Sequence, residues 1–351
     1  MSKRVMMTGN VATAEGAIAA GCRYFFGYPI TPQNDIPRYM SEQLPQIGGV
    51  YLQAESELAS INLVYGAAST GAYVMTSSSS PGISLMQEGL SYLLGAELPA
   101  VVVNMVRGGP GLGNIAPAQS DYWLSTRGAG HGDFGCLTFT PDSVQELYDC
   151  TYDAFEIGHK YRLPVMILGD AMIANMSEAT RLRERREPPT QMPEWAVGGR
   201  RNGRPRRVVN SLWTDVPVME AVNLRIAERF RQAAQEQTRW EEYGDDRPDI
   251  LFTAYGISAR ICKTAIDRLA DEGLRARLLR PITVRPFPTD PFARWAGQVE
   301  RIVCVEHSMG QFIEDVRLSV DCRPVELISR TGGVLMTPEE VIARTRELIA
   351  S

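Results

Sequence analysis

The stretch Gly27-Tyr28-Pro29-Ile30-Thr31-Pro32 follows an apolar run, Tyr24-Phe25-Phe26, and precedes a segment over 34–44 that can form a helix. The apolar run is typical of a buried strand, so the stretch marks the point where that strand ends. Ligands of open α/β folds sit at the carboxyl edge of a parallel sheet, and this strand end would bring the hydroxyl of Thr31 there. Taken alone, a proline-rich turn without chemistry is the better interpretation.

The rest of the first half alternates short apolar segments with helix-like ones. We expect strands at 4–8, 23–28, 49–53, 72–76, 99–106 and 163–168, and helices at 11–21, 55–70, 80–96 and 143–161. Repeated β-then-α units predict a parallel sheet with right-handed crossovers. This alternation stops near residue 180, where prolines, glycines and arginines crowd the chain.

The second half begins with a long helix candidate over 216–242 and then alternates again. We expect strands at 249–254, 275–279, 301–305 and 325–328, helices at 258–271, 311–320 and 338–349, and a loop with four prolines over 281–291. The chain is therefore predicted to be α/β in two parts. An α/β domain over 1–180 leads through a connector over 181–215 to a smaller α/β domain over 216–351.

Composition and charge exclude several classes of protein. The chain has 351 residues, a net charge of -5 and 22% charged residues, which argues against binding to nucleic acid or to an anionic membrane surface. It shows no signal peptide and no apolar run of membrane-spanning length. Its six cysteines and three histidines lack metal-ligand spacing. We expect a cytoplasmic protein that holds no metal ion or iron–sulfur cluster by itself.

Two acids lie where the strand at 49–53 gives way to a helix. Glu55 and Glu57 are two residues apart, so on a helix their side chains point about 200° apart and only one can face a pocket. The alternative is that both are solvated acids of the first turn, where they favour the helix dipole.

The apolar strand over 101–106 ends in Arg107, which is followed by several glycines. Arginine is the residue best suited to bidentate capture of a carboxylate, although a surface arginine paired with a nearby acid remains the alternative. The glycines do not fit the dinucleotide fingerprint, which argues against a nicotinamide- or flavin-dependent enzyme.

Two further stretches could carry chemistry. The turn over 76–82 places hydroxyls and free N–H groups at a helix start, which can bind an anion or a polar ring or can simply over-supply an N-cap. His131 lies between glycines in Gly130-His131-Gly132-Asp133, where it is either a catalytic acid or base or an ordinary loop residue.

In order and spacing these elements resemble the α subunits of the 2-oxoacid:ferredoxin oxidoreductase family, over nearly the whole chain. The resemblance rests on Tyr28-Pro29-Ile30-Thr31-Pro32, Glu55-Ser56-Glu57, the turn over 76–82, Arg107-Gly108-Gly109-Pro110, Gln119-Ser120-Asp121-Tyr122, residues 130–133, Met309-Gly310-Gln311 and Glu314-Asp315-Val316-Arg317. The branched-chain type, which acts on 2-oxoisovalerate, is the most similar. Types that act on 2-oxoglutarate, pyruvate or aryl 2-oxoacids are the alternatives.

This resemblance implies a fold, an activity and a site. It implies a thiamine diphosphate-binding domain of the pyrimidine type, followed by a domain like the transketolase C-terminal domain. The implied reaction is coenzyme A-dependent oxidative decarboxylation of a 2-oxoacid, with electrons passed to ferredoxin. Glu57 matches the acid that hydrogen-bonds the coenzyme's aminopyrimidine ring, Arg107 the arginine that grips the substrate carboxylate, and Thr31 a substrate-binding hydroxyl. Pro29, Ile30 and Ser80 are implied in coenzyme binding, and the role of His131 stays open.

The resemblance also implies partner chains. Thiamine enzymes bind diphosphate and Mg²⁺ with Gly-Asp-Gly and an Asn about 25 residues later (a feature of those families), and Gly132-Asp133-Phe134, Gly169-Asp170-Ala171 and Gly244-Asp245-Asp246 all lack the third glycine. A β subunit would supply that half of the site, and γ and ferredoxin-like δ subunits would complete the enzyme, with [4Fe-4S] clusters in the partners. We expect two such assemblies around a dyad, and an apolar surface where partners bind. A non-catalytic scaffold with the same fold is the competing hypothesis.

Overall fold

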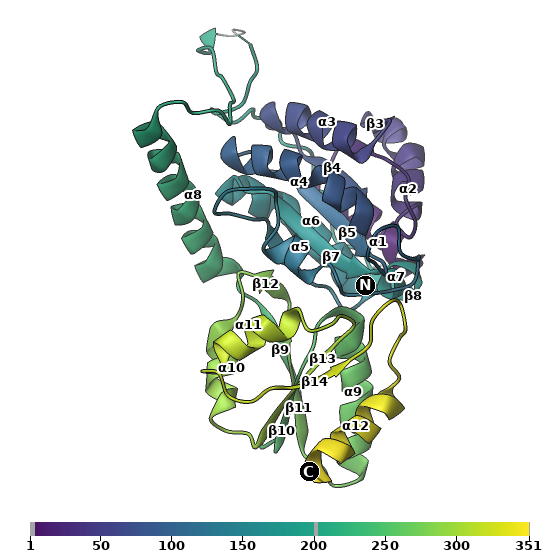
Figure 1. Cartoon of the computed structure of the whole chain (residues 1–351). Coiled ribbons are helices and arrows are strands. Elements are labelled where there is room, and N and C mark those ends of the chain that lie inside the picture. Colours follow the sequence, from purple (N-terminus) through teal and green to yellow (C-terminus); the bar gives the residue numbers. More distant parts are fainter. Residues whose placement is uncertain (1–3, 200–202, 351) are drawn as a thin grey trace.

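The computed structural model describes residues 4–199 and 203–350, so residues 200–202 of the predicted connector lie outside the described part, as do 1–3 and 351. Figure 1 shows two α/β units, one above the other, with the long helix α8 (Val216–Gln237) running along the side of the upper unit. Irregular chain after residue 181 leads into this helix.

A seven-stranded sheet forms the centre of the first unit. Its strands, in spatial order, are β12 (Thr283–Arg285), β6 (Leu137–Phe139), β7 (Val165–Asp170), β5 (Val101–Val106), β4 (Val74–Ser78), β2 (Tyr24–Gly27) and β3 (Val50–Gln53). All neighbours are parallel except β12 and β6. The predicted loop over 281–291 is therefore wrong at residues 283–285. These residues form the edge strand β12 and pair with β6, and local composition carries no signal of such a distant partner.

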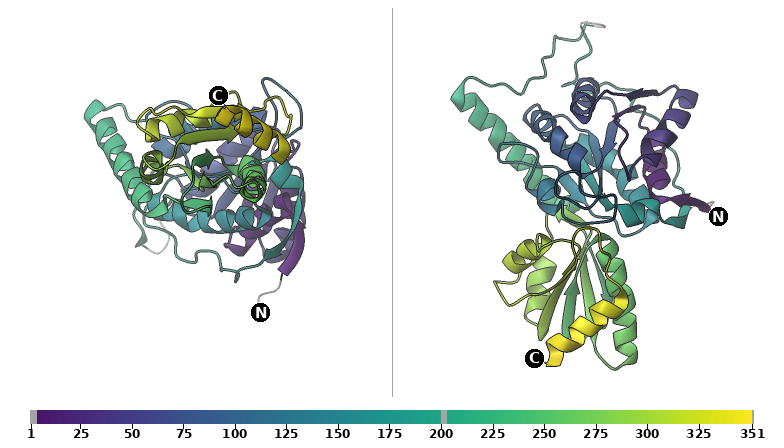
Figure 2. Two further views of the ribbon diagram at one scale, coloured as in Figure 1. Left: turned by 90° about the horizontal axis from the view of Figure 1, so that it is seen from below. Right: turned by 45° about the vertical axis from the view of Figure 1, so that its right-hand side comes forward.

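Helices cover both faces of this sheet (Figure 2). Helices α1 (Gly9–Ala19) and α6 (Val144–Tyr161) pack against each other, and α3 (Glu57–Ser69) packs against α4 (Ser80–Gly95). The shorter helices are α2 (Asp35–Gln43), η1 (Pro45–Ile47), α5 (Tyr122–Thr126) and α7 (Ala171–Asn175). The first predicted strand, β1 (Arg4–Thr8), lies outside the main sheet and pairs antiparallel with β8 (Ser177–Arg181).

The strand order defines where a ligand should bind. The chain leaves β2 toward the edge strand β3, whereas it leaves β4 in the opposite direction toward β5. With right-handed crossovers, the helices that follow β2 and β4 lie on opposite faces, so a crevice opens between the carboxyl ends of these two strands. The stretch 27–32 and the turn 76–82 therefore face the same crevice.

The second unit is a five-stranded sheet. Its order is β14 (Glu326–Ser329), β13 (Arg301–Glu306), β10 (Ile250–Thr253), β11 (Ala276–Pro281) and β9 (Trp240–Gly244), with only β9 antiparallel to its neighbour. Helices α9 (Gly256–Asp271), α10 (Thr289–Ala296), α11 (Phe312–Ser319) and α12 (Pro338–Ala350) cover it. Helix α8 ends five residues before the predicted limit of 242, because residues 240–244 pair with β11 instead.

The two units share a continuous interior. One apolar cluster joins Val106, Tyr122 and Leu168 of the first unit to Tyr255 and Phe312 of the second. The rings of Tyr122, Tyr255 and Phe312 contact one another, with centroids 5.3 to 5.7 Å apart. Nowhere in residues 4–199 and 203–350 is there a helix with the length and apolar character needed to cross a membrane.

Candidate functional site

Thr31 and Arg107 meet at the carboxyl edge of the first sheet. Nη1 of Arg107, at the end of β5, donates to the main-chain oxygen of Thr31 at 3.0 Å. The Thr31 hydroxyl accepts from Nδ2 of Asn34 at 3.1 Å, and no described residue receives the hydroxyl's own hydrogen. This half-buried hydroxyl is therefore able to donate to a ligand beside the guanidinium.

The Arg107 guanidinium is a buried cation without an anionic partner. Its side chain is held by neutral groups, because Nη2 donates to the main-chain oxygen of Leu112 at 2.9 Å and Nη1 to that of Thr31. Nε is buried and has no hydrogen-bond partner, and Arg107 forms no ion pair with any described residue. A buried charge that is hydrogen-bonded but not neutralised is suited to receive an anion.

Ser80, Asn104 and Asp121 form a set of buried polar groups next to Arg107, and Ser80 holds the Arg107 backbone. The Ser80 hydroxyl accepts from the Arg107 N–H at 3.1 Å, and the amide of Asn104 donates to the Asp121 carboxylate at 3.0 Å. Burial raises the pKa of Asp121, while hydrogen bonds from Ser80 and Asn104 and the charge of Arg107 act in the opposite direction. Sequence reasoning did not single out Asn104 or give Asp121 a role, since neither shows its contacts in the local pattern.

Glu57 and Glu55 differ in burial, and only Glu57 belongs to α3, because Ser56 is the N-cap of this helix. Glu57 is the first residue of α3 and is 6% exposed, whereas Glu55 is exposed. Among the described residues, the Glu57 carboxyl has no hydrogen bond or ion pair. It lies against the first turn of α4, because a Cβ added at Gly82 would come within 2.4 Å of Oε1 of Glu57 and 2.0 Å of the Ser78 hydroxyl.

Helix α4 links the carboxylate to the cation. Its first residue, Ser80, touches Arg107, and its third, Gly82, touches Glu57. Around this turn the hydroxyls of Thr76, Ser78 and Ser79 are fully buried and have no hydrogen-bond partner within the described part of the chain. Such unpaired groups are rare unless a ligand completes them. An unpaired acid, three hydroxyls and a cation fit a polar heterocycle with a carboxylate substrate beside it, as thiamine diphosphate chemistry requires.

The remaining predicted coenzyme residues lie on the same wall. Pro29 is exposed and Ile30 is half-buried. The wall is braced from behind by Gln33, whose amide donates to the oxygen of Tyr28 at 3.1 Å and whose carbonyl accepts from Ser77 at 2.5 Å.

His131 lies elsewhere. Its main-chain oxygen accepts from Ser91, eleven residues beyond Ser80 on α4, which is about 16 Å along the helix. Its exposed side chain lines a hollow of about 130 Å³ between α4 and α8, together with Asp133 and Phe134. The structure therefore does not bring His131 together with Thr31, Glu57 and Arg107.

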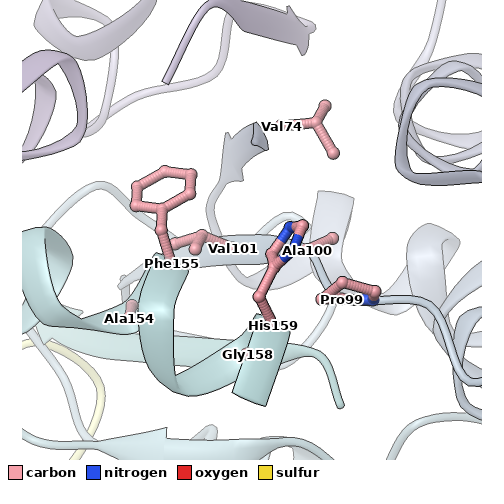
Figure 3. Close-up of a pocket in the computed structure, with 8 residues that line it drawn as sticks. All are labelled: Val74, Pro99, Ala100, Val101, Ala154, Phe155, Gly158 and His159. Atoms are coloured by element: carbon pink, nitrogen blue, oxygen red, sulfur yellow. The ribbon is translucent and has the colours of Figure 1, made fainter. Parts of the chain in front are cut away.

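A second histidine lines an apolar hollow at the opposite edge of the sheet (Figure 3). The hollow lies between α6 and the amino ends of β4 and β5, and it leaves no room for a water molecule. Its lining residues are Val74, Pro99, Ala100, Val101, Ala154, Phe155, Gly158 and His159. Burial lowers the pKa of His159 to about 4, which keeps the ring neutral. This hollow contains no second polar side chain and offers no chemistry.

The histidine, cysteine and acidic side chains of the described residues are the candidate ligands of a metal ion. The described chain contains no group of three or more histidine, cysteine, aspartate or glutamate side chains that could hold one. Five of the six cysteines are buried, and the sixth, Cys322, is exposed.

Two family profiles match successive parts of the sequence. One, described as pyruvate flavodoxin/ferredoxin oxidoreductase, thiamine diphosphate-binding, matches residues 15–241. The other, described as pyruvate:ferredoxin oxidoreductase core domain II, matches residues 248–341.

Two curated relatives match almost end to end. The chain is 45% identical over 343 residues to the ketoisovalerate oxidoreductase subunit VorB of Methanothermobacter thermautotrophicus, covering 98% of this chain and 97% of that protein. It is 35% identical over 360 residues to the 2-oxoglutarate synthase subunit KorA of Methanocaldococcus jannaschii, covering 95% and 97%.

Solved structures match the fold. The 2-oxoglutarate:ferredoxin oxidoreductase from Magnetococcus marinus, with 2-oxoglutarate, coenzyme A and succinyl-CoA bound, has a TM-score of 0.88 and 25% identity, covering 99% of this chain and 66% of that chain. A split-gene transketolase has a TM-score of 0.61 at 12% identity, which shows a shared fold alone. The VorB and KorA relatives are both named as subunits. The predicted fold class and the family resemblance are confirmed, and the chain belongs to the thiamine diphosphate-dependent 2-oxoacid:ferredoxin oxidoreductase family.

Proposed function

We propose that this chain supplies the coenzyme's pyrimidine side and the substrate-carboxylate receptor of an enzyme that oxidises a branched-chain 2-oxoacid, such as 2-oxoisovalerate, to its acyl-CoA. Glu57, Thr31 and Arg107 carry the chemistry in this proposal. Ser80 acts with Pro29 and Ile30 in forming the coenzyme wall. Electrons leave through partner chains to ferredoxin.

The state of Arg107 is the observation that carries the proposal. A 2-oxoacid presents a planar carboxylate. A buried guanidinium that uses only two of its five N–H groups, both on neutral main-chain oxygens of the described residues, is its natural receptor. Thr31 lies within the same hydrogen-bonded unit, so its hydroxyl can donate to the substrate while the carboxylate is bound. Holding both groups in one orientation lowers the entropic barrier to reaction.

Glu57 has a separate task. When bound, thiamine diphosphate supplies the carbon nucleophile that adds to the 2-oxo group. The buried Glu57 carboxyl, unpaired among the described residues and pressed against Gly82, can hold and orient an aminopyrimidine ring by hydrogen bonding. The contact with Gly82 also closes off the side of the carboxyl that faces α4.

The residues beside the receptor favour an apolar substrate tail. Leu112, whose main-chain oxygen binds Arg107, exposes 82% of its surface, and Ile115 exposes 63%. Residues 108–126 contain no lysine or arginine that could receive a second carboxylate. These features support a branched aliphatic 2-oxoacid over 2-oxoglutarate, in line with the name of the relative at 45% identity.

The incomplete site supports partner chains. We propose a β subunit that binds the coenzyme's diphosphate with Mg²⁺, γ and ferredoxin-like δ subunits, and [4Fe-4S] clusters in those partners. Leu58, Leu85 and Leu112 are exposed apolar side chains and are candidates for burial by the β subunit. A dimer of such assemblies and a cytoplasmic location remain predictions.

Purification of the whole complex tests the substrate. Coenzyme A-dependent viologen reduction would be measured with 2-oxoisovalerate, 2-oxoglutarate, pyruvate and an aryl 2-oxoacid. We expect kcat/KM for 2-oxoisovalerate to exceed the others by about tenfold or more. An inert 2-oxoisovalerate with an active 2-oxoglutarate would show that the branched-chain assignment is wrong.

A further inference from the structure

The Arg107 guanidinium donates to the main-chain oxygens of Thr31 and Leu112, and the loop that follows Arg107 determines where the Leu112 oxygen lies. The Asn114 N–H donates to the oxygen of Gly108 at 2.9 Å, and the Gly108 N–H donates to the oxygen of Ala116 at 3.0 Å. The loop is so tightly closed that a Cβ at Gly113 would lie 1.7 Å from the oxygen of Gly108. Because the Leu112 oxygen accepts from Arg107, the position of this folded loop sets one side of the guanidinium.

The stem of this loop is fastened to the second unit by Gln119. This side chain is 2% exposed, and its amide donates to the oxygen of Tyr255 at 2.7 Å. Its side-chain carbonyl accepts from the Ser258 hydroxyl at 2.7 Å and from the main-chain N–H of His307 at 2.9 Å. The Gln119 N–H donates in turn to the oxygen of His307 at 2.9 Å. The side-chain amide of Gln119, a residue of the first unit, is thus hydrogen-bonded entirely to residues of the second unit.

The direction of these hydrogen bonds requires an amide at position 119. Nε2 of His307 accepts from the Met336 N–H at 3.0 Å, so the neutral ring carries its proton on Nδ1. The Nδ1–H group of His307 therefore donates to the Ser258 hydroxyl oxygen, 2.7 Å away. The Ser258 hydroxyl in turn donates its own hydrogen to the Gln119 carbonyl. A carboxylate at position 119 would instead face the Tyr255 oxygen without a proton.

The tip of the loop has a second attachment to the same unit. The Asn114 amide donates to the oxygen of Gly332 at 2.8 Å, and a Cβ at Gly333 would lie 2.5 Å from Cβ of Ala116. The shared apolar cluster, which includes Ala118, fills the space beneath the stem. The second unit therefore contacts the loop at its tip, along its stem and from below.

We propose that Gln119 is a positioning residue for substrate recognition, through which the second unit holds the loop and thereby orients the Arg107 guanidinium toward the substrate carboxylate. This rests on the proposed role of Arg107. It gives the second unit, which contributes none of the reacting groups assigned above, a direct part in 2-oxoacid binding.

The test compares Gln119→Leu, Arg107→Lys and the double variant in the whole complex. We expect Gln119→Leu to raise KM for the 2-oxoacid about tenfold, while KM for coenzyme A and the affinity for thiamine diphosphate stay unchanged. In the Arg107→Lys background the same change should add little, because both act through one guanidinium. Additive effects, or a KM that Gln119→Leu leaves unchanged, would overturn the positioning role.

A control variant separates positioning from stability. Lys263 of the second unit donates to the Asp142 carboxylate of the first at 2.7 Å, so Lys263→Met removes a contact between the same units elsewhere. It should lower the Tm without changing KM for the 2-oxoacid. If Gln119→Leu does not assemble, Gln119→Glu is measured in the same way, and an unchanged KM again overturns the proposal. If Arg107→Lys itself leaves KM unchanged, the proposed function falls as well, whereas a raised KM there with no effect of Gln119 overturns only this inference.

Discussion

Nη1 of Arg107 donates to the main-chain oxygen of Thr31 at 3.0 Å, which joins the end of β5 to the end of β2 across the crevice. The two residues are 76 positions apart in the sequence. This contact places a cation and a hydroxyl donor on one rigid unit. It explains why a proline-rich strand end, which read alone is only a turn, lies beside a buried arginine.

Replacing Arg107 with lysine tests the receptor. Lysine keeps the charge but cannot donate in the fork geometry that reaches both Thr31 and Leu112, so the substrate carboxylate loses its aligned partner. We expect kcat/KM for the 2-oxoacid to fall about 100-fold, which corresponds to roughly 3 kcal/mol. Steady-state kinetics of the complex give this value.

Arg127→Lys is the matched control, because Arg127 is exposed and pairs with Glu314 and Asp315. Its kcat/KM should stay close to that of the wild type. Equal kinetic effects of the two lysine variants would contradict a special role for Arg107.

Gly82→Ala tests the contact between α4 and Glu57. The new Cβ would lie 2.4 Å from Oε1 of Glu57, so the carboxyl must move out of its place. We expect coenzyme affinity, measured by calorimetric titration of the complex, to fall at least about tenfold.

Gly66→Ala provides the comparison on the neighbouring helix. A Cβ there meets no atom within 4 Å, so this change should leave binding unaltered and stabilise α3 by about 0.5–1 kcal/mol. Unchanged coenzyme binding in Gly82→Ala would show that the close contact has no function.

His159 predicts a dependence of stability on pH. Burial lowers its pKa to about 4 from an ordinary value of 6.5. The unfolded chain therefore binds more protons below pH 6.5, and the free energy of unfolding falls as the pH drops toward 4. Burial lowers the pKa of His307 to about 4 as well, and it raises that of Asp170 to about 6, which acts in the opposite direction.

Because these groups overlap, the measured quantity is a difference between variants. His159→Phe keeps the ring contact with Tyr73, whose centroid is 4.5 Å away. Between pH 6.5 and pH 4, the free energy of unfolding measured with urea should fall by about 2–3 kcal/mol less in His159→Phe than in the wild type. Parallel curves for His159→Phe and the wild-type protein would refute the assignment.

The parallel sheet could be predicted because each strand carries its own local pattern. The run over 101–106 is apolar throughout, and the strand β5 is buried at every position. Local geometry predicted that only one of Glu55 and Glu57 can face inward, and the family resemblance identified Glu57 as that acid. Burial of Glu57 and exposure of Glu55 agree with that expectation.

Features that depend on distant pairing could not be predicted. Strand β12 exists only because it meets β6, more than 140 residues earlier in the chain. Gln119 looks like a polar loop residue until Tyr255, Ser258 and His307 surround it. His131 shows the opposite error, since its glycine-flanked pattern indicated possible chemistry but the loop carries it along α4 and away from the site.

The most direct test of the central claim is turnover of the whole complex carrying Glu57→Gln, with Glu55→Gln as its matched control. Both changes replace a carboxyl with an amide at the same strand-to-helix junction, but only Glu57 is buried against α4. We predict that Glu57→Gln assembles normally and loses at least about 100-fold in coenzyme A-dependent viologen reduction, while Glu55→Gln retains wild-type activity. Unchanged turnover in an assembled Glu57→Gln complex would contradict the account and favour a non-catalytic scaffold.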